Sequence, residues 1–156
     1  MSELIFQKII KLLTDGGISF ELLEHEPVYT SEQAAKLRGT SLKMGAKALI
    51  FNADAKPIMI VVAGDKRVET KRFKELYHIH NLEMASSEEV EKVTDGVKIG
   101  AVHPLGNIHG LTVYVDTSLG HNKIVVFNAG LHDKSIKMQY KDYYSLVKPK
   151  LGDFSI

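Results

Sequence analysis

Two short apolar runs that lie close together in the chain, residues 46–52 and 57–63, constrain the fold more than any other feature of the sequence. A polar segment that includes Asp54 and Lys56 separates them. Each run is far shorter than the roughly 20 residues of a membrane-spanning helix. Apolar runs of this length on both sides of a short polar connection are typical of paired strands. The sequence therefore predicts a buried β-hairpin here.

Helix and strand signals lie on both sides of the predicted hairpin. Apolar residues between positions 4 and 13 recur at helical spacing until a pair of glycines ends the run. Thr30 with Gln33, and Ser86 with Glu89, have the spacing of capping boxes and indicate two helix starts. The full prediction is helices over residues 4–13, 30–39, 69–77, 88–93 and 141–147, and further strands over residues 18–23, 112–116, 123–128 and 135–138.

The order of these elements is mixed, because it lacks the strict alternation of strand and helix that marks a doubly wound sheet. We therefore predict an α/β or mixed α+β fold with a largely antiparallel, barrel-like central sheet flanked by helices. The 156 residues contain no long linker or low-complexity segment. This length is typical of one domain, and we expect residues 1–156 to form it.

Charge and cysteine content exclude several classes of protein. Lys and Arg total 20 and Asp and Glu total 19, so the net charge is +1 and a nucleic-acid partner would have to be bound by a local patch. The absence of Cys excludes thiol nucleophiles, thiolate zinc sites and disulfides. The amino terminus lacks a basic segment before a long apolar run, so no signal peptide is predicted. We expect a soluble cytoplasmic protein.

Common catalytic motifs are missing from the sequence. No P-loop, dinucleotide fingerprint, G-x-S-x-G elbow or H-E-x-x-H motif occurs. If their stretch is a strand, His78 and His80 would share one face and could bind a metal, with His103 or His109 completing the site. Carboxylates at matching spacing are not evident, so the sequence favours surface or strand-edge histidines and no metal.

Two features are better candidates for a site. Lys47 lies at the start of an apolar strand, where it is either exposed at an edge or directed into a cleft. Composition favours exposure, but an inward ammonium would suit a phosphate or a developing oxyanion. The segment over residues 100–106 contains Gly100, Pro104 and Gly106, and it could present main-chain N–H groups to a ligand or simply connect two strands.

Several short motifs occur along the chain in a distinctive order. They are His25-Glu26-Pro27 with Thr30 and Ala34, then Lys47, residues 61–65 with Val68, residues 85–90, Gly96, Gly100, Pro104, Gly106, residues 113–116, 128–130 and 135–138. In order and spacing they resemble the YbaK/ProX-type aminoacyl-tRNA deacylases, free-standing relatives of the prolyl-tRNA synthetase editing domain. The resemblance covers about residues 20–147.

The resemblance implies hydrolysis of the ester between a wrong, small amino acid and the terminal adenosine of a tRNA. It implies that Lys47 lies beside the ester and that Gly100 opens a G-x-x-x-P loop which holds the aminoacyl group through main-chain groups. It further implies substrate-binding positions at His25, Thr30, Ala101, Val102, His103, Pro104, Gly106, Asp116, Asn128 and Gly130. A ribose hydroxyl of the substrate is expected to help activate water, so neither a protein general base nor a cofactor is expected.

Two positions depart from the family pattern. Ala48 follows Lys47 where the family often has Thr, and Asp95 precedes Gly96 where a Thr-Gly pair is common. Thr94 lies one position earlier. Because these positions can line the pocket, both departures leave undetermined which amino acid the protein removes.

A mischarged tRNA is the expected partner, and an aminoacyl-tRNA synthetase is a second one. There are two groups of cations, Lys36, Arg38 and Lys43, and then Lys66, Arg67, Lys71, Arg72 and Lys74; either one of the groups contacts the acceptor stem, or both are solvated helix faces. Two other functions remain open. One is a non-catalytic module of the same fold that binds tRNA or a synthetase; the other is a metal-dependent hydrolase that uses His78, His80 or His103.

Overall fold

The computed structural model describes residues 2–156, which form helices and strands in mixed order. The α-helices are α1 (Ser2–Asp15), α2 (Ser31–Arg38), α3 (Thr70–Tyr77), α4 (Ser87–Val93) and α5 (Tyr140–Val147). The strands are β1 (Phe20–Glu24), β2 (Ala46–Ala53), β3 (Lys56–Ala63), β4 (Leu82–Met84), β5 (Val113–Asp116), β6 (Ile124–Leu131), β7 (Lys134–Gln139) and β8 (Lys150–Gly152). Short 3₁₀ turns are η1 (Leu42–Met44), η2 (Ile99–Ala101), η3 (Gly106–His109) and η4 (Thr117–His121).

The helix ends follow the capping residues that the sequence indicated. Thr30 accepts a hydrogen bond from the N–H of Gln33, and Gly39 ends α2 in the left-handed conformation at a φ of 68°. Both hydrogen bonds of the capping box form between Ser86 and Glu89 at the start of α4. No helix within residues 2–156 is long and apolar enough to cross a membrane.

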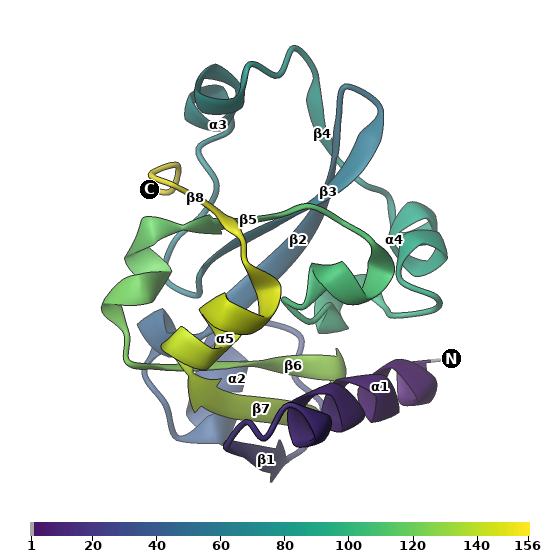
Figure 1. Cartoon of the computed structure of the whole chain (residues 1–156), viewed down its shortest axis with the longest axis vertical. Helices are drawn as coiled ribbons and strands as arrows, with labels where there is room; N and C mark the ends of the chain where they lie inside the picture. Colours follow the sequence, from purple (N-terminus) through teal and green to yellow (C-terminus); the bar gives the residue numbers. More distant parts are fainter. Residues whose placement is uncertain (1) are drawn as a thin grey trace.

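The strands form two sheets, so the mixed α+β class is confirmed but the barrel-like closure of one central sheet is not. One sheet has the order β1-β7-β6 and is antiparallel. The other has the order β4-β2-β3-β5-β8, in which β2 pairs antiparallel with β3 and β4 while β5 is parallel to both neighbours. Figure 1 shows the five-stranded sheet in the upper half and the three-stranded sheet with α1 in the lower half.

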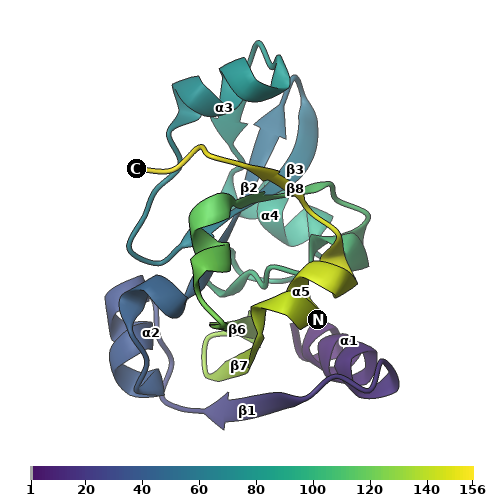
Figure 2. The same ribbon diagram turned by 60° about the vertical axis from the view of Figure 1, so that its left-hand side comes forward.

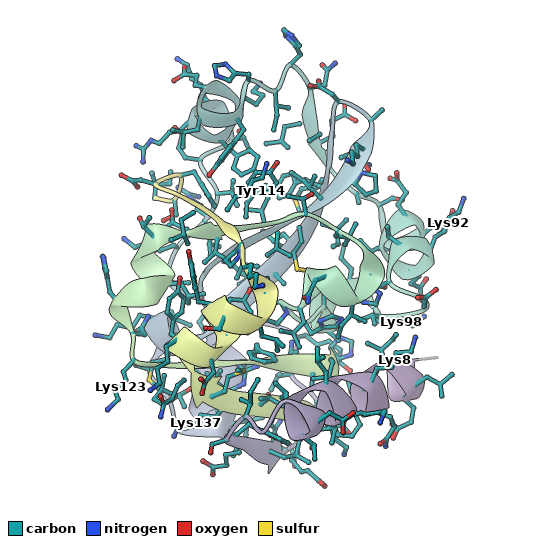
Figure 3. The ribbon with its side chains drawn as sticks, viewed as in Figure 1. Lys8, Lys92, Lys98, Tyr114, Lys123 and Lys137 are labelled. Atoms are coloured by element: carbon teal, nitrogen blue, oxygen red, sulfur yellow. The ribbon has the colours of Figure 1, made fainter. Side chains whose placement is uncertain are left out.

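The predicted hairpin is buried on both faces, which explains its continuous apolar sequence. One face, with residues such as Met59 and Val61, belongs to the main core between the sheets. The other face, with Ile60 and Val62, packs against Phe73 of α3 in a smaller core. Side chains of Tyr77, Tyr114 and Phe154 complete this smaller core, and Figure 3 shows Tyr114 in the upper part of the molecule.

The two sheets touch near the start of β2, where Gly45 forms a parallel bridge with Val126 of β6. Helix α2 lies beside this junction, at the lower left of Figure 2. The carbonyl of Gly45 also accepts a hydrogen bond from the N–H of Gly64 at 2.8 Å, so the chain just beyond β3 is held here too. The junction therefore brings together segments that are far apart in sequence.

The strand that a ligand pair of His78 and His80 would require is not present. Residues 78–81 are not a strand, because α3 ends at His78 with a φ of 54° and the next strand, β4, starts at Leu82. His78 and His80 therefore do not lie on one face of a strand as a ligand pair.

Candidate active site

A cavity of about 210 Å³ opens at the junction of the two sheets. Its walls come from the loop before α2 and from α2 itself, from η1 and the start of β2, from Gly64, from the segment with Gly100, and from Asn128 of β6. This volume lies below the roughly 300–1,000 Å³ of pockets for drug-sized ligands. The cavity is therefore suited to a small group, with the remainder of a larger ligand outside.

Lys47 lines this cavity and is half-buried. Its Nζ donates a hydrogen bond to the carbonyl of Lys66 at 2.7 Å, which holds the ammonium group against the chain beyond β3. Burial lowers the pKa of Lys47 below its usual value, and the carboxylates of Glu32 and Asp65 oppose that shift. Of the two placements that the sequence left open, the structure has the one directed into a cleft.

Gly100 lines the same cavity as Lys47. Of the neighbouring residues, Ile99 and Val102 also contribute to the wall. A Cβ at Gly100 would lie 3.0 Å from Nε2 of His132, so the glycine allows a close approach between this segment and the β6–β7 connection. The cavity thus combines one ammonium group with a wall of exposed main chain.

The rest of the predicted loop faces the core instead of the cavity. Ala101, His103, Pro104 and Gly106 are buried and do not line the cavity. The carbonyl of Pro104 accepts a hydrogen bond from Tyr143 at 2.8 Å. A Cβ at Gly106 would lie 2.8 Å from Cγ2 of Val113, so this glycine is required for packing. These residues therefore anchor the loop in the core and do not form the cavity wall.

The other predicted positions divide between the cavity and the framework. Thr30 and Asn128 line the cavity. His25 lies next to it, where its Nε2 bonds Ser135 Oγ at 2.7 Å. Gly130, at a φ of 86°, packs against Ile5 of α1.

Asp116 is outside the cavity and anchors the carboxy-terminal segment. Its carboxylate accepts hydrogen bonds from the N–H of Phe154 at 2.8 Å and from Ser155 Oγ at 2.7 Å. Ser118 donates two more, from its N–H and its hydroxyl. Burial alone would raise the pKa of Asp116, but these hydrogen bonds hold it below its usual value. The carboxylate is therefore fully engaged within the protein.

His103 forms a buried pair with His109. Their Nε2 atoms are 2.9 Å apart, and the N–H of Leu105 donates to Nδ1 of His103 at 3.1 Å. His103 therefore carries its proton on Nε2 and donates it to His109. Burial, and secondarily His109, lowers the pKa of His103 to about 3, so the ring is neutral at physiological pH. Within residues 2–156, no three His, Asp or Glu side chains come together as a metal site.

Sequence reasoning missed the inward placement of Arg38. The guanidinium group at the last position of α2 lines the cavity, although Arg38 was grouped with surface cations. Burial lowers its pKa to about 10, which leaves it cationic at neutral pH. The labelled lysines in Figure 3 lie at the periphery on opposite sides of the molecule. Among the described residues that line the cavity, the positive charge comes from Arg38 and Lys47.

The sequence also did not indicate that Tyr29 and His132 lie at the site. Tyr29 is 68% exposed at the edge of the cavity, and its ring lies 4.6 Å from that of His132. No motif marks either residue in the sequence. Tyr29 reaches the cavity with the loop before α2, and the N–H of Val28 in that loop donates to the carbonyl of His132 at 3.0 Å.

The cavity presents an ammonium, a guanidinium, hydroxyls and main-chain groups, and its lining within residues 2–156 contains no carboxylate or imidazole. Such a set can bind a small polar group and stabilise negative charge, but it offers no conventional general base. The fold and site therefore define a small α+β protein with a cationic pocket whose wall is partly main chain.

Comparison with known proteins agrees with this class. Residues 25–146 match the family described as the aminoacyl-tRNA editing domain, so the chain belongs to that family. It is 32% identical to the multifunctional Ser/Thr-tRNA deacylase ProXp-y of Escherichia coli K12, with 95% of this chain and 91% of the relative covered. It is 27% identical to the prolyl-tRNA editing protein ProX of Acetoanaerobium sticklandii, with 95% and 93% covered.

Solved structures show the same fold. A protein suggested to be a trans-editing enzyme for prolyl tRNA synthetase matches with a TM-score of 0.84 at 22% identity, and 97% of each chain is covered. A proline–tRNA ligase of Caldicellulosiruptor bescii is 34% identical over 70% of this chain but only 19% of the ligase. The domain therefore occurs in relatives both alone and within a much longer protein.

Proposed function

We propose that this protein is an aminoacyl-tRNA deacylase that acts in trans in the cytoplasm, as a single domain over residues 1–156. Its substrate is a tRNA whose terminal adenosine carries a wrong, small amino acid. The observation that carries the proposal is that Lys47 and Gly100 line one small cavity in a chain of the editing family. The names of the relatives, a Ser/Thr-tRNA deacylase and a prolyl-tRNA editing protein, support the same reaction.

The protein has to lower the activation barrier only modestly, because an aminoacyl ester is already activated toward hydrolysis. Water adds to the ester carbonyl carbon, and the carbonyl oxygen gains negative charge. Lys47, held by the carbonyl of Lys66, has further N–H donors for that oxygen. The ester bond to the ribose then breaks and the ribose oxygen takes a proton, which leaves the free amino acid and the deacylated tRNA.

Activation of water is assigned to the substrate. Because the cavity lining within the described chain lacks a carboxylate or imidazole, we assign a ribose hydroxyl of the terminal adenosine to orient the water; it accepts the proton of the water while it passes its own proton to the ribose oxygen of the ester. The protein contributes position and a fixed positive charge. Positioning of this kind can lower a barrier by several kcal/mol, on the order of 7–11 in the best cases.

The rest of the tRNA is assigned to exposed cations near the cavity mouth. Lys36 lies on α2, Lys43 is next to the lining residue Leu42, and Arg67 follows the residue that holds Lys47. Arg72, in the second group of cations, is already within ion-pair distance of Glu69 and Asp153. We therefore assign the acceptor end to Lys36, Lys43 and Arg67, and a synthetase remains a candidate second partner.

The decisive experiment is release of amino acid from a panel of tRNAs charged with different small amino acids. We expect wild-type protein to deacylate at least one non-cognate pair. Lys47→Ala is expected to lose activity by about 10²–10³-fold, as when one donor to an oxyanion is removed. Its melting temperature should change little, because Lys47 makes a single hydrogen bond.

Lys11→Ala is the matched control, because Lys11 is exposed on α1 and, within residues 2–156, its one ion pair is with Asp15. Full activity of the Lys47 variant would contradict the assigned role. Binding of the charged tRNAs without hydrolysis of any would instead favour a non-catalytic binding module.

A further inference from the structure

Arg38 is a cation at the cavity that has no anionic partner. None of the ion pairs within residues 2–156 includes it. Its Nε donates to Ser135 Oγ at 2.9 Å, and its Nη2 donates to Asn128 Oδ1 at 2.9 Å. An uncompensated, half-buried charge is costly, so its position calls for a role beyond packing.

The two acceptors of Arg38 are partners across one pair of strands. Asn128 on β6 lies directly opposite Ser135 on β7, and the register of the hairpin shifts immediately after this pair. A planar guanidinium can donate to both at once, whereas the ammonium of a lysine presents a single point of charge. Arg38 thus fixes the last residue of α2 to the regular end of the β6–β7 hairpin.

Arg38 also fixes which way the Asn128 amide faces. Because a guanidinium can only donate, the oxygen of the amide must face Arg38 and its nitrogen must face the other way. That nitrogen donates to the carbonyl of Gly100 at 3.0 Å. A continuous path of two hydrogen bonds therefore runs from Arg38 through Asn128 to the cavity wall.

A second branch runs from Arg38 away from the loop. Since Ser135 Oγ accepts from Arg38, its own hydrogen is directed to Nε2 of His25. Nδ1 of His25 then donates to the carbonyl of Glu26 at 2.7 Å. This branch ends in the segment before α2 and does not reach Gly100. A variant that breaks this branch is therefore a control for variants that break the path through Asn128.

We infer that Arg38 is a positioning residue which, through Asn128, sets the place of the Gly100 wall relative to Lys47. The inference rests on the proposed function only for its effect on rate. A wall that moves by about 1 Å can cost about 10²-fold in rate even when the chemical groups remain. The same movement changes the room for the amino acid side chain, so discrimination between acyl groups of different size changes with it.

The test compares four variants in two assays. Arg38→Met removes the donors, and Asn128→Asp keeps an acceptor for Arg38 but loses the donor to Gly100. Ser135→Ala cuts only the second branch, and a double variant, Arg38→Met with Asn128→Asp, tests additivity. The assays are steady-state deacylation of seryl- and alanyl-tRNA substrates and hydrogen exchange of the amides in residues 98–104.

We expect Arg38→Met and Asn128→Asp each to lower kcat by about 10- to 100-fold with little change in KM. Each should change the ratio of rates for the two amino acids and speed exchange at the Ala101 amide. The double variant should be no worse than the more affected single variant, since both cut one path. Ser135→Ala should leave exchange in residues 98–104 at the wild-type rate.

The inference is overturned if the two losses multiply, if Asn128→Asp exchanges and reacts like wild type, or if Ser135→Ala loosens the loop as much as Arg38→Met does. If Arg38→Met does not fold, Asn128→Asp still decides the question, because it retains the contact with Arg38. A wild-type protein that hydrolyses no charged tRNA would overturn the proposed function. The exchange measurements would still test whether Arg38 holds the loop.

Discussion

Two polar clusters of this molecule hold a charged group, and they hold it in opposite ways. Asp116 accepts hydrogen bonds from Ser118, Ser155 and the N–H of Phe154, all within the protein. Arg38 donates to two neutral side chains and faces an open cavity beside Lys47. Both regions contained residues that the sequence indicated as site candidates. A charge whose hydrogen bonds all lie within the protein stabilises the fold, whereas a charge beside a cavity can also set the position of the cavity wall.

The largest effect is expected from removing the carboxylate of Asp116. Asp116→Ala is expected to lower the free energy of unfolding by about 3–5 kcal/mol, because several hydrogen bonds to a charged group, each worth about 1.5–3 kcal/mol, are lost. Deacylation by the protein that remains folded should match wild type. Urea unfolding and initial rates at a temperature well below melting measure the two effects. A large loss of rate in fully folded protein would place Asp116 in the reaction instead.

Between pH 7 and about pH 4.5, a smaller effect is expected from acid, through the neutral histidine behind the cavity wall. The unfolded chain protonates His103 near its ordinary pKa of about 6.5, whereas the folded chain keeps it neutral down to a pKa of about 3. Stability is therefore fully present above pH 6.5 and is lost as pH falls toward 3, by up to about 1.4 kcal/mol per pH unit. Burial also lowers the pKa of His109, so this group acts in the same direction.

Urea unfolding between pH 7 and about pH 4.5 measures this slope. The slope should diminish in His103→Gln and persist in His80→Gln, which changes an exposed residue outside the core. An unchanged slope in the His103 variant would assign the acid sensitivity to other groups.

The smallest effects are expected at two glycines of one segment, Gly106 and Gly100. Gly106→Ala places a Cβ 2.8 Å from Val113 and 3.0 Å from the sulfur of Met59, so it should cost about 1–3 kcal/mol of stability. Gly100→Ala meets only the end of the His132 side chain, at 3.0 Å, which can move aside.

Gly100→Ala should therefore keep its stability within about 0.5 kcal/mol. It should lower kcat/KM for the better substrate by about tenfold, since one methyl group at a pocket wall is worth about 1–3 kcal/mol. Thermal unfolding and kinetics on the same preparations test both variants. Equal losses of stability in the two variants would show that Gly100 is required for packing in the same way as Gly106.

Much of the fold could be predicted because its signals are local. The β2–β3 hairpin follows from two apolar runs, and the ends of α2 and α4 follow from Thr30, Gly39 and Ser86. The three-residue strands β4 and β8 have too few residues for a periodic pattern, and their pairing is set by distant partners. The two-sheet arrangement was missed for the same reason.

The candidate site was predictable only in part. Lys47 and the segment with Gly100 were candidates from local sequence, and a family resemblance gave them their expected roles; both residues line one cavity. Arg38 could not be recognised, because a cation in the last turn of a helix is normally solvated and interacts with the helix dipole. Asp116 and Asn128 looked alike in sequence, since nothing local shows whether a polar side chain at a strand end is satisfied by the protein.

The pairing of β5 has a consequence for the kinetics of folding. β5 is parallel to β3, which precedes it by some fifty residues, and to β8, which follows η4, the β6–β7 hairpin and α5. Contacts of such large sequence separation form late, after loop closure has been overcome. The β2–β3 hairpin, with a two-residue connection, can form early. The rate-limiting step of folding is therefore expected to be the insertion of β5 between its two partners, and nascent chains lacking β8 should populate an incomplete sheet.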